Sequence, residues 1–250
     1  IKSLYNVNVS PDRIFIMPGG KPTMHYAISF YGEPGAEIIY PDPGFPIYES
    51  MINYTGAKPV PYNLVENNNF NIDVDKILSL INEKTRLLII NNPHNPTGSF
   101  TEKKEIDKLA NNLKKFPNLA ILSDEIYGRL IFEKKEFPTL LNYPDLYDRL
   151  IVLDGWSKTY AMTGWRLGWG VWPQKLIKNL FKFCVNNHSC VNAAIQYGAI
   201  AALDGPEDSI NIMVNKFIYR KNLMLEGLKK IKGIKCTDPK AGFFMFPNVK

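Results

Sequence analysis

The sequence predicts an α/β fold in which a mostly parallel sheet is covered by helices. Apolar runs of strand length alternate along the chain with amphipathic stretches of helix length, an order that places helices on the faces of a sheet. Several apolar runs contain no polar residue, as expected of strands that are buried on both faces. With 250 residues, 45% of them hydrophobic, the chain can bury a substantial core.

The first half of the chain alternates strands with helices. In chain order, strands are expected at 13–17, 37–40 and 86–91, a short extended segment at 59–62, and helices at 22–30, 47–54 and 73–80. The next helix is predicted to begin at Thr101, because a threonine oxygen can accept a hydrogen bond from the free N–H groups of a helix start.

The second half continues this alternation and then becomes mainly helical. Buried strands are expected at 119–124 and 150–154, helices at 174–184, 193–203 and 209–230, and strands at 234–236 and 242–246. The strands before residue 155 end in polar residues, at the sheet edge where open α/β folds bind ligands. We expect a large domain over residues 1–220 and the beginning of a smaller, incomplete α+β domain over residues 221–250.

Composition excludes several classes of protein. The formal charge of +6 comes from lysines scattered along the chain rather than from a basic stripe, so a nucleic-acid partner is not expected. No apolar stretch reaches the roughly 18 residues of a membrane span, and the start of the chain lacks a signal-peptide pattern. Three cysteines without C-x-x-C spacing predict neither disulfides nor a metal site and favour a reducing cytoplasm. Because the chain begins with Ile1, we expect it to start partway into a longer protein.

Two glycine-containing or proline-containing turns follow predicted strands. Gly19-Gly20-Lys21 opens a helix, where backbone N–H groups favour a phosphate, although a tight turn that needs glycine explains the pair equally well. In the segment Asn91-Asn92-Pro93-His94-Asn95-Pro96-Thr97-Gly98, the prolines and the final glycine predict a rigid turn that aims the Asn95 amide.

Lys158 lies in a dense run of aromatic, small and glycine residues that extends from Asp154 to Trp169. A lysine forms a Schiff base with an aldehyde only when its amine is deprotonated and held in one place. An isolated Ser-Lys pair would be an ordinary surface feature, but hydroxylated neighbours and Arg166 in the same run suit an amine beside a phosphate.

In order and spacing, these segments resemble the class I and II aminotransferases, which are fold-type I, aspartate-aminotransferase-like enzymes that use pyridoxal 5'-phosphate (PLP). The run around Lys158 resembles the Schiff-base segment of that family, and Asn-Pro-x-Asn-Pro-Thr-Gly is characteristic of it. The resemblance extends from Gly19 to Arg166 and, more loosely, to residue 250. It implies a three-layer αβα PLP-transferase large domain, the start of a smaller α+β domain, and a homodimer.

The resemblance also implies which residues hold PLP and move protons. Lys158 would form the Schiff base and shuttle the proton, and Asp124, in Ser123-Asp124-Glu125-Ile126-Tyr127, would keep the pyridine nitrogen protonated. Asn95 and Tyr127 would contact the phenolic oxygen. Phe45, in Asp42-Pro43-Gly44-Phe45, would stack on the ring.

At the phosphate, the resemblance points to Gly19, Gly20, Lys21 and Arg166, whose guanidinium matches phosphate oxygens. Many members of the family carry a serine three residues before the lysine, whereas this chain has Gly155, so we expect Ser157 or backbone amides to compensate. The family varies at the position of His94, which we interpret as a loop residue.

The implied reaction moves an amino group from an L-amino acid to a 2-oxo acid in two half-reactions, with ping-pong kinetics. The arginine that binds the substrate α-carboxylate is expected beyond residue 250, and the tyrosine offered to a neighbouring subunit's phosphate before Ile1. The segment 184–190, which the resemblance places near the substrate side chain across the dimer, contains no arginine, which weakens a strictly dicarboxylate specificity.

Two other hypotheses remain open from the sequence. A PLP-dependent β-eliminating (C–S) lyase of the same fold would share every motif, and would release pyruvate and ammonia without a keto-acid acceptor. A noncatalytic nucleotide-binding α/β protein would use Gly19-Gly20 for a dinucleotide, but the chain lacks the Gly-x-Gly-x-x-Gly fingerprint of that class.

Overall fold

A seven-stranded sheet forms the centre of the structure, a computed structural model that describes residues 1–133 and 135–249. Its strands are β1 (Ile14–Met17), β2 (Glu37–Asp42), β3 (Lys58–Asn63), β4 (Thr85–Asn91), β5 (Ala120–Asp124), β6 (Leu150–Gly155) and β7 (Gly168–Val171). They lie in the order β1-β7-β6-β5-β4-β2-β3. Neighbours from β3 to β6 are parallel, and β7 is antiparallel to both β6 and β1. The predicted mostly parallel α/β fold is thus confirmed.

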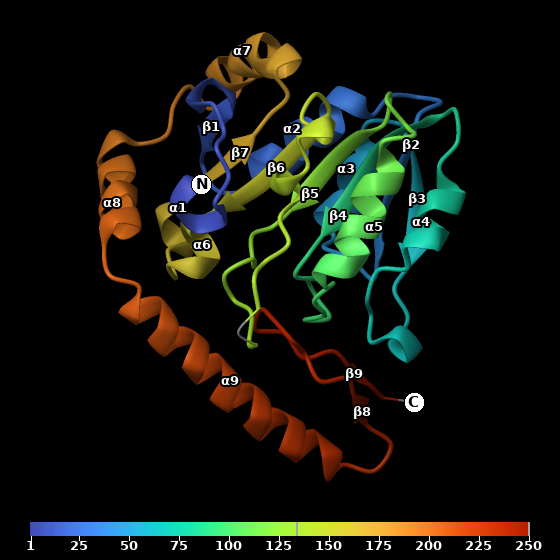
Figure 1. Cartoon of the computed structure of the whole chain (residues 1–250), viewed down its shortest axis with the longest axis vertical. Helices are drawn as coiled ribbons and strands as arrows, with labels where there is room; N and C mark the ends of the chain where they lie inside the picture. Colours follow the sequence, from blue (N-terminus) through green and yellow to red (C-terminus); the bar gives the residue numbers. More distant parts are fainter. Residues whose placement is uncertain (134, 250) are drawn as a thin grey trace.

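Helices cover both faces of this sheet (Figure 1). One layer contains α2 (Lys21–Tyr31), α3 (Ile47–Tyr54) and α7 (Ile177–Asn187); the other contains α4 (Val74–Leu80), α5 (Lys103–Leu113) and α8 (Ala193–Asp204). Side chains alternate along the strands, so Leu87 and Ile89 of β4 pack into the first layer, whereas Leu88 and Ile90 pack into the second. Because both faces are covered, the middle strands are apolar throughout.

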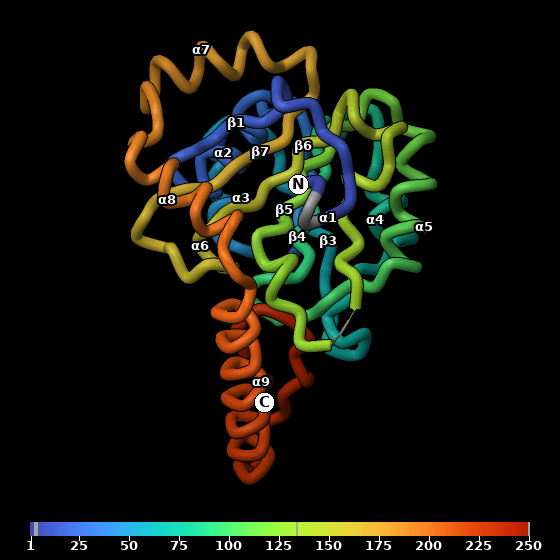
Figure 2. The backbone as a smooth tube through the Cα atoms, turned by 60° about the vertical axis from the view of Figure 1, so that its left-hand side comes forward, coloured from blue at the N-terminus to red at the C-terminus, as the bar shows by residue number. Residues whose placement is uncertain are grey.

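The chain leaves this body through a long helix, α9 (Asp208–Lys229), which the two views show extending away from the sheet (Figures 1 and 2). It leads to a small antiparallel pair, β8 (Lys235–Cys236) and β9 (Pro247–Asn248). The predicted boundary at residues 220/221 falls inside α9, and Lys250 lies outside the described residues. Of the helices in this described part, none is long and apolar enough to cross a membrane.

Two local predictions are wrong. Thr101 does not cap α5, which begins at Lys103 after Glu102. Thr101 is instead buried, and its backbone N–H and C=O groups bond the side chain of Asn92 at 2.9 and 3.1 Å, so the helix starts only after this anchored residue.

The segment 242–246, predicted as a strand, is a turn followed by irregular chain, and the strand there is β9. Gly242 has a φ of +72°, outside the range of a β-strand, and its N–H donates to the Leu130 carbonyl at 2.8 Å. The hydrogen bonds of this segment therefore go to the loop after β5 rather than to a partner strand.

Candidate active site

A cavity of about 280 Å³ lies where β4, β5 and β6 end. Strand ends converge there because parallel strands meet one edge of the sheet with the same terminus. All predicted site residues except Gly19 line this cavity, although they come from segments far apart in the sequence: Gly20, Lys21, Phe45, Asn95, Asp124, Tyr127, Ser157, Lys158 and Arg166.

Lys158 enters the cavity from α6 (Trp156–Thr159), the short helix that directly follows β6. Its Nζ atom lies 5.9 Å from the ring centroid of Tyr127 and 5.4 Å from that of Phe243. Burial lowers the pKa of the Lys158 amine, and the nearby Arg166 charge lowers it further, whereas Asp124 raises it. The net effect favours the neutral amine, which is the nucleophilic form.

Asp124 ends β5 beside Asn91 of β4 and is only 2% exposed. Its carboxylate accepts hydrogen bonds from the Tyr48 hydroxyl at 2.6 Å and from the Ile126 N–H at 3.2 Å. Burial raises the pKa of Asp124 to about 6, and these two hydrogen bonds oppose the increase. The group is therefore mostly ionised at neutral pH, and it can hold a cation in a desolvated site.

Asn95 is held in place by Asn91. The Asn91 side chain accepts from the Asn95 N–H at 2.9 Å and donates to the Asp124 carbonyl at 3.2 Å, which ties the turn to the end of β5. Burial raises the pKa of the Tyr127 hydroxyl, as does the charge of Asp124, and a hydrogen bond with the Asn95 side chain only partly opposes this. Tyr127 therefore remains a protonated hydrogen-bond donor.

His94, in the same turn, does not line the cavity. It is buried, and its Nδ1 atom lies 2.8 Å from the Thr97 hydroxyl. Burial lowers the pKa of His94 to about 3, so the imidazole is neutral at physiological pH. Its position agrees with the interpretation of His94 as a loop residue.

Two cations, Lys21 and Arg166, also line the cavity. Lys21, the first residue of α2, lies with its Nζ 5.7 Å from the centroid of the Phe45 ring. Arg166 crosses Gly19, where a Cβ atom would lie 2.4 Å from the guanidinium, and its Nη1 donates to the Thr163 carbonyl at 2.7 Å. Two cations beside the free N–H groups of a helix start can bind an anion such as phosphate.

Gly155, where a serine was expected by resemblance, packs against the backbone of β7. A Cβ atom on Gly155 would lie 2.6 Å from the Cα of Gly168, and one on Gly168 would lie 2.6 Å from the Gly19 carbonyl carbon. The three glycines let β6, β7 and the Gly19 turn approach closely. The absence of a side chain at Gly155 thus has a steric cause.

Several residues of the site were not identified from the sequence. Tyr48 does not line the cavity but contacts the lining residue Asp124, and that contact depends on how α3 packs on the sheet. The others do line the cavity, are mostly apolar and carry no local motif: Met24, Ile126, Leu153, Thr163, Phe243 and Phe244.

Phe243 and Phe244 reach the cavity on a strap, which we define as residues 238–244. Backbone hydrogen bonds join it to the large body at Lys240 N to Gly98 O (2.8 Å), Phe132 N to Lys240 O (2.9 Å) and Gly242 N to Leu130 O (2.8 Å). The strap therefore runs beside the Asn95–Gly98 turn and the loop after β5, and these contacts place the Phe243 and Phe244 rings at the cavity.

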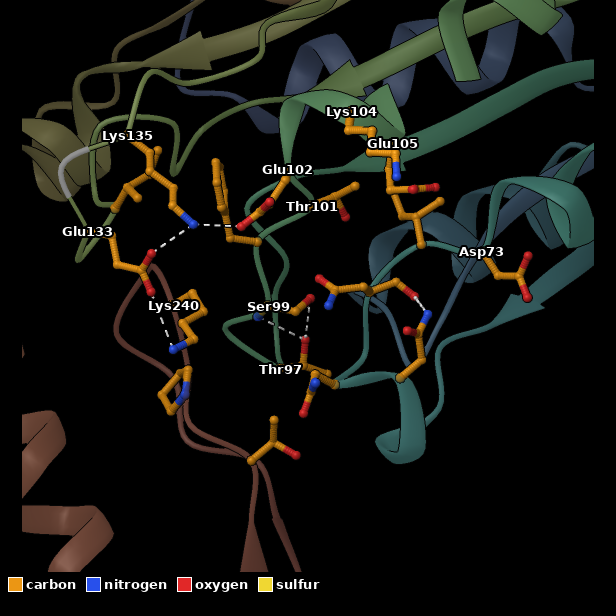
Figure 3. A pocket seen from close by; sticks show the side chains of 18 of the residues that line it. Asp73, Thr97, Ser99, Thr101, Glu102, Lys104, Glu105, Glu133, Lys135 and Lys240 are labelled. Carbon is orange, nitrogen blue, oxygen red and sulfur yellow. Dashed lines mark hydrogen bonds and ion pairs between the residues drawn. The ribbon is translucent and has the colours of Figure 1, made fainter. Parts of the chain in front are cut away.

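A second, larger cavity of about 670 Å³ contains none of the predicted site residues (Figure 3). It is lined by Thr97, Ser99 and many charged side chains, and an ion-pair chain crosses it from Glu102 to Lys135 (2.6 Å), to Glu133 (2.8 Å) and to Lys240 of the strap (3.3 Å). Four of its charged side chains are thus paired with one another. Among residues 1–133 and 135–249, no group of three or more His, Cys, Asp or Glu residues could hold a metal ion.

Comparisons with known proteins agree with this geometry. The model of the family described as aminotransferase class I and II matches residues 1–250. An aspartate aminotransferase from Sulfolobus acidocaldarius is 36% identical over 99% of this chain and 62% of its own length, and a probable aspartate aminotransferase from Methanocaldococcus jannaschii is 36% identical over 100% and 66%. The chain thus spans less than two thirds of the length of these curated relatives.

Solved structures give the same result. The aspartate aminotransferase from Rhizobium meliloti superposes with a TM-score of 0.95 at 28% identity, covering 99% of this chain and 62% of that one. The aromatic aminotransferase from Pyrococcus horikoshii superposes with a TM-score of 0.92 at 30% identity, covering 98% and 66%.

Proposed function

The chain belongs to the class I and II aminotransferase family, and from this premise we propose that the full-length protein is a PLP-dependent aminotransferase. It would move an amino group from an L-amino acid to a 2-oxo acid by a ping-pong mechanism. The observation that carries the proposal is Lys158, an amine with a lowered pKa in the same cavity as the buried carboxylate of Asp124 and the cations Lys21 and Arg166.

The residues present fit PLP. A basic end with helix N–H groups suits the phosphate, and would hold it through Gly19, Gly20, Lys21, Ser157 and Arg166. The anionic Asp124 suits a protonated ring nitrogen, Phe45 can cover the ring, and Asn95 and Tyr127 can donate to a phenolic oxygen. When bound, PLP supplies an electron-withdrawing ring that stabilises the charge left on the substrate α-carbon after its proton is removed.

The chain's own groups would carry out the proton transfers. Lys158, whose amine pKa is lowered by burial and by the Arg166 charge, would hold the cofactor through its aldehyde and would accept the proton from the substrate α-carbon. Asp124 stays anionic because Tyr48 and the Ile126 N–H donate to it. Phe243 and Phe244 exclude water from one side of the lysine.

A homodimer is part of this proposal. Aromatic and aliphatic side chains of α7 and α8 are exposed, among them Phe181 at 60%, Tyr197 at 76% and Ile200 at 52%. Exposed apolar surface of this kind is typical of subunit interfaces. We also propose that residues from 221 onward begin a smaller domain, and that the protein works in the cytoplasm, where its three free cysteines would stay reduced.

Peptide mapping tests the covalent role of Lys158. The full-length protein is loaded with PLP, reduced with borohydride and digested; mass spectrometry should find the cofactor on Lys158. Lys158→Ala should lose the visible absorbance of lysine-bound PLP, whereas Lys178→Ala, on the exposed surface of α7, should keep it. Attachment at another lysine, or no PLP binding, would contradict the proposal.

A half-reaction screen tests the reaction type. Single amino acids are added to the PLP-loaded protein, beginning with aspartate because the curated relatives are named as aspartate aminotransferases. Stoichiometric formation of pyridoxamine phosphate and a 2-oxo acid supports transamination. Catalytic release of pyruvate and ammonia without an acceptor would instead identify a β-eliminating lyase.

A further inference from the structure

We infer that Asp154 is a positioning residue for the proposed reaction. From the reverse face of the sheet, its carboxyl group fixes the start of the short helix that carries Lys158, and Tyr5 fixes that carboxyl group in turn. The inference rests on the proposed role of Lys158. It adds two residues, Asp154 and Tyr5, that lie outside the cavity.

Asp154 lies behind the cavity rather than in it. It follows Leu153 near the end of β6, and successive side chains of a strand point to opposite faces of the sheet. Leu153 lines the cavity, whereas Val152 packs on the opposite face, in the same cluster as Tyr5. Asp154 shares the face of Val152 and is only 4% exposed. It can therefore set the position of Lys158 only through the backbone between them.

The helix that carries Lys158 has few hydrogen bonds of its own. α6 is a single turn of four residues, and helices this short are not stable without tertiary contacts. The Tyr160 N–H donates to the Trp156 carbonyl at 3.1 Å, and the Ala161 N–H donates to the Lys158 carbonyl at 3.3 Å. Because these bonds fix only the end of the turn, its start has to be fixed from outside.

Asp154 supplies that fixed point. Its Oδ1 atom accepts the N–H of Gly155, the residue directly before α6, at 2.6 Å. Its Oδ2 atom accepts a hydrogen bond from the Tyr5 hydroxyl, and both side chains are buried. Tyr5 is the last residue of α1 (Lys2–Tyr5) and lies 149 residues before Asp154. The Asp154 carboxyl group thus joins α1 to the residue at which α6 begins.

A shift of α6 would move the Lys158 amine relative to the rest of the cavity. The amine has to reach the cofactor aldehyde, and a misplacement of about 1 Å can lower a rate about a hundredfold. Asn95 and Asp124 enter the cavity from the ends of β4 and β5 and do not depend on α6. Without the Asp154 contact, we therefore expect slower bonding of Lys158 to PLP and little change in the noncovalent binding of PLP.

The test measures how fast the cofactor-free full-length protein forms lysine-bound PLP, by stopped-flow absorbance. In Asp154→Ala, the rate constant at saturating PLP should fall about tenfold, whereas the PLP concentration that gives half the maximal rate should stay within about twofold. Asp154→Asn should keep both values within about twofold, because its amide can accept from the Gly155 N–H and donate to the Tyr5 oxygen. Tyr5→Phe should lower the rate constant about threefold, since the carboxyl group loses one of its two partners.

Asp107→Ala and Tyr143→Phe are the matched controls. The Tyr143 hydroxyl also donates to a carboxylate, that of Asp107, but neither residue lines the cavity or bonds the backbone near Lys158. Both variants should stay within about twofold of the original rate.

The inference is overturned if Asp154→Ala bonds PLP at the original rate, or if Asp154→Asn is as slow as Asp154→Ala. Should Asp154→Ala fail to fold, an unchanged rate in Tyr5→Phe overturns it equally. Failure of the unaltered protein to form lysine-bound PLP would overturn the proposed function itself, so the two failures are distinguishable.

Discussion

The Tyr48 hydroxyl donates a 2.6 Å hydrogen bond to Oδ2 of Asp124, and both side chains are buried. Tyr48 comes from α3 and Asp124 from the end of β5, so the bond joins a covering helix to the sheet edge. Burial raises the pKa of Asp124 to about 6, and this bond opposes that rise. Tyr48 therefore helps to keep the Asp124 carboxylate charged near neutral pH.

Replacing Tyr48 with phenylalanine should shift the acid limb of activity. Without the hydroxyl, the pKa of Asp124 should rise by about one further unit, since a hydrogen bond to a charged group contributes about 1.5 kcal/mol. Activity should then be lost at a higher pH as the medium is acidified, because Asp124 must be ionised to hold a protonated ring nitrogen. The pH profile of kcat/KM checks this.

Tyr62→Phe is the matched control for Tyr48→Phe. Tyr62 is also a buried tyrosine, but its hydroxyl donates to the Ile89 carbonyl at 3.2 Å rather than to Asp124. Its acid limb should stay in place. Equal acid limbs in Tyr48→Phe and the original protein would show that the hydrogen bond does not control Asp124.

The sequence could predict those site residues that lie in contiguous motifs at strand ends. Asn95, Asp124 and Lys158 each follow an apolar strand, and parallel strands bring their carboxyl ends to one edge, so their convergence followed from the fold class. Tyr48 and Phe243 could not be predicted this way. Tyr48 lies 76 residues before its partner Asp124, and Phe243 lies in a different segment of the chain from Lys158. Only the packing of the folded chain brings each pair together.

The same distinction explains the secondary structure. Apolar runs such as residues 87–90, within the strand predicted at 86–91, identified the buried strands because burial on both faces favours apolar side chains at every position. The run Gly242–Phe246 is equally apolar, yet it is not a strand, because the rings of Phe243 and Phe244 line the cavity and the Gly242 N–H donates to the Leu130 carbonyl. An apolar run alone does not say whether its side chains fill a core or line a site.

Asp154 should make stability depend on pH. It is buried, it accepts hydrogen bonds from the Tyr5 hydroxyl and from the Gly155 N–H, and burial raises its pKa from 3.8 to about 7. Since the folded state binds this proton more tightly than the unfolded chain, ionisation of Asp154 destabilises the fold progressively as pH rises from about 4 to about 7.

Asp154→Asn removes that ionisation. Relative to the original protein, the variant should therefore gain about 1 to 4 kcal/mol in free energy of unfolding between pH 4.5 and pH 8, by the usual linkage of pKa to stability. Urea unfolding of the cofactor-free protein at the two pH values measures the difference. The exposed Asp12→Asn should show little such change, and a gain toward acid pH in Asp154→Asn would contradict the assignment.

Introducing the serine that many relatives carry should not improve cofactor binding here. In Gly155→Ser, the new Cβ would lie 2.6 Å from the Gly168 Cα, so β6 and β7 must separate. We expect a loss of about 1 to 3 kcal/mol in stability and weaker PLP binding, measured by urea unfolding and by absorbance titration. Gly164→Ser is the control, because a Cβ there meets nothing within 4 Å. Tighter PLP binding in Gly155→Ser would show that β6 and β7 can separate without disturbing the cofactor site.

Gly98→Ala should loosen the strap that carries Phe243. Gly98 has a φ of +71°, and a Cβ there would lie 2.6 Å from Pro239 Cβ and 3.2 Å from the Ala241 and Phe244 carbonyl oxygens. The strap would have to move away, which should cost about 2 to 4 kcal/mol from the combined backbone strain and clash. Faster proteolysis within 238–244 should accompany this loss.

Gly35→Ala separates the effect of backbone strain from the effect of the steric clash. Gly35 also has a positive φ, +91°, but a Cβ there meets nothing within 4 Å, so this variant carries the backbone strain without the clash. It should cost about 1 kcal/mol in free energy of unfolding and leave proteolysis of the strap unchanged. If the two variants lose equal stability and the strap is cleaved at the same rate in both, the close contact between Gly98 and Pro239 does not hold the strap in place.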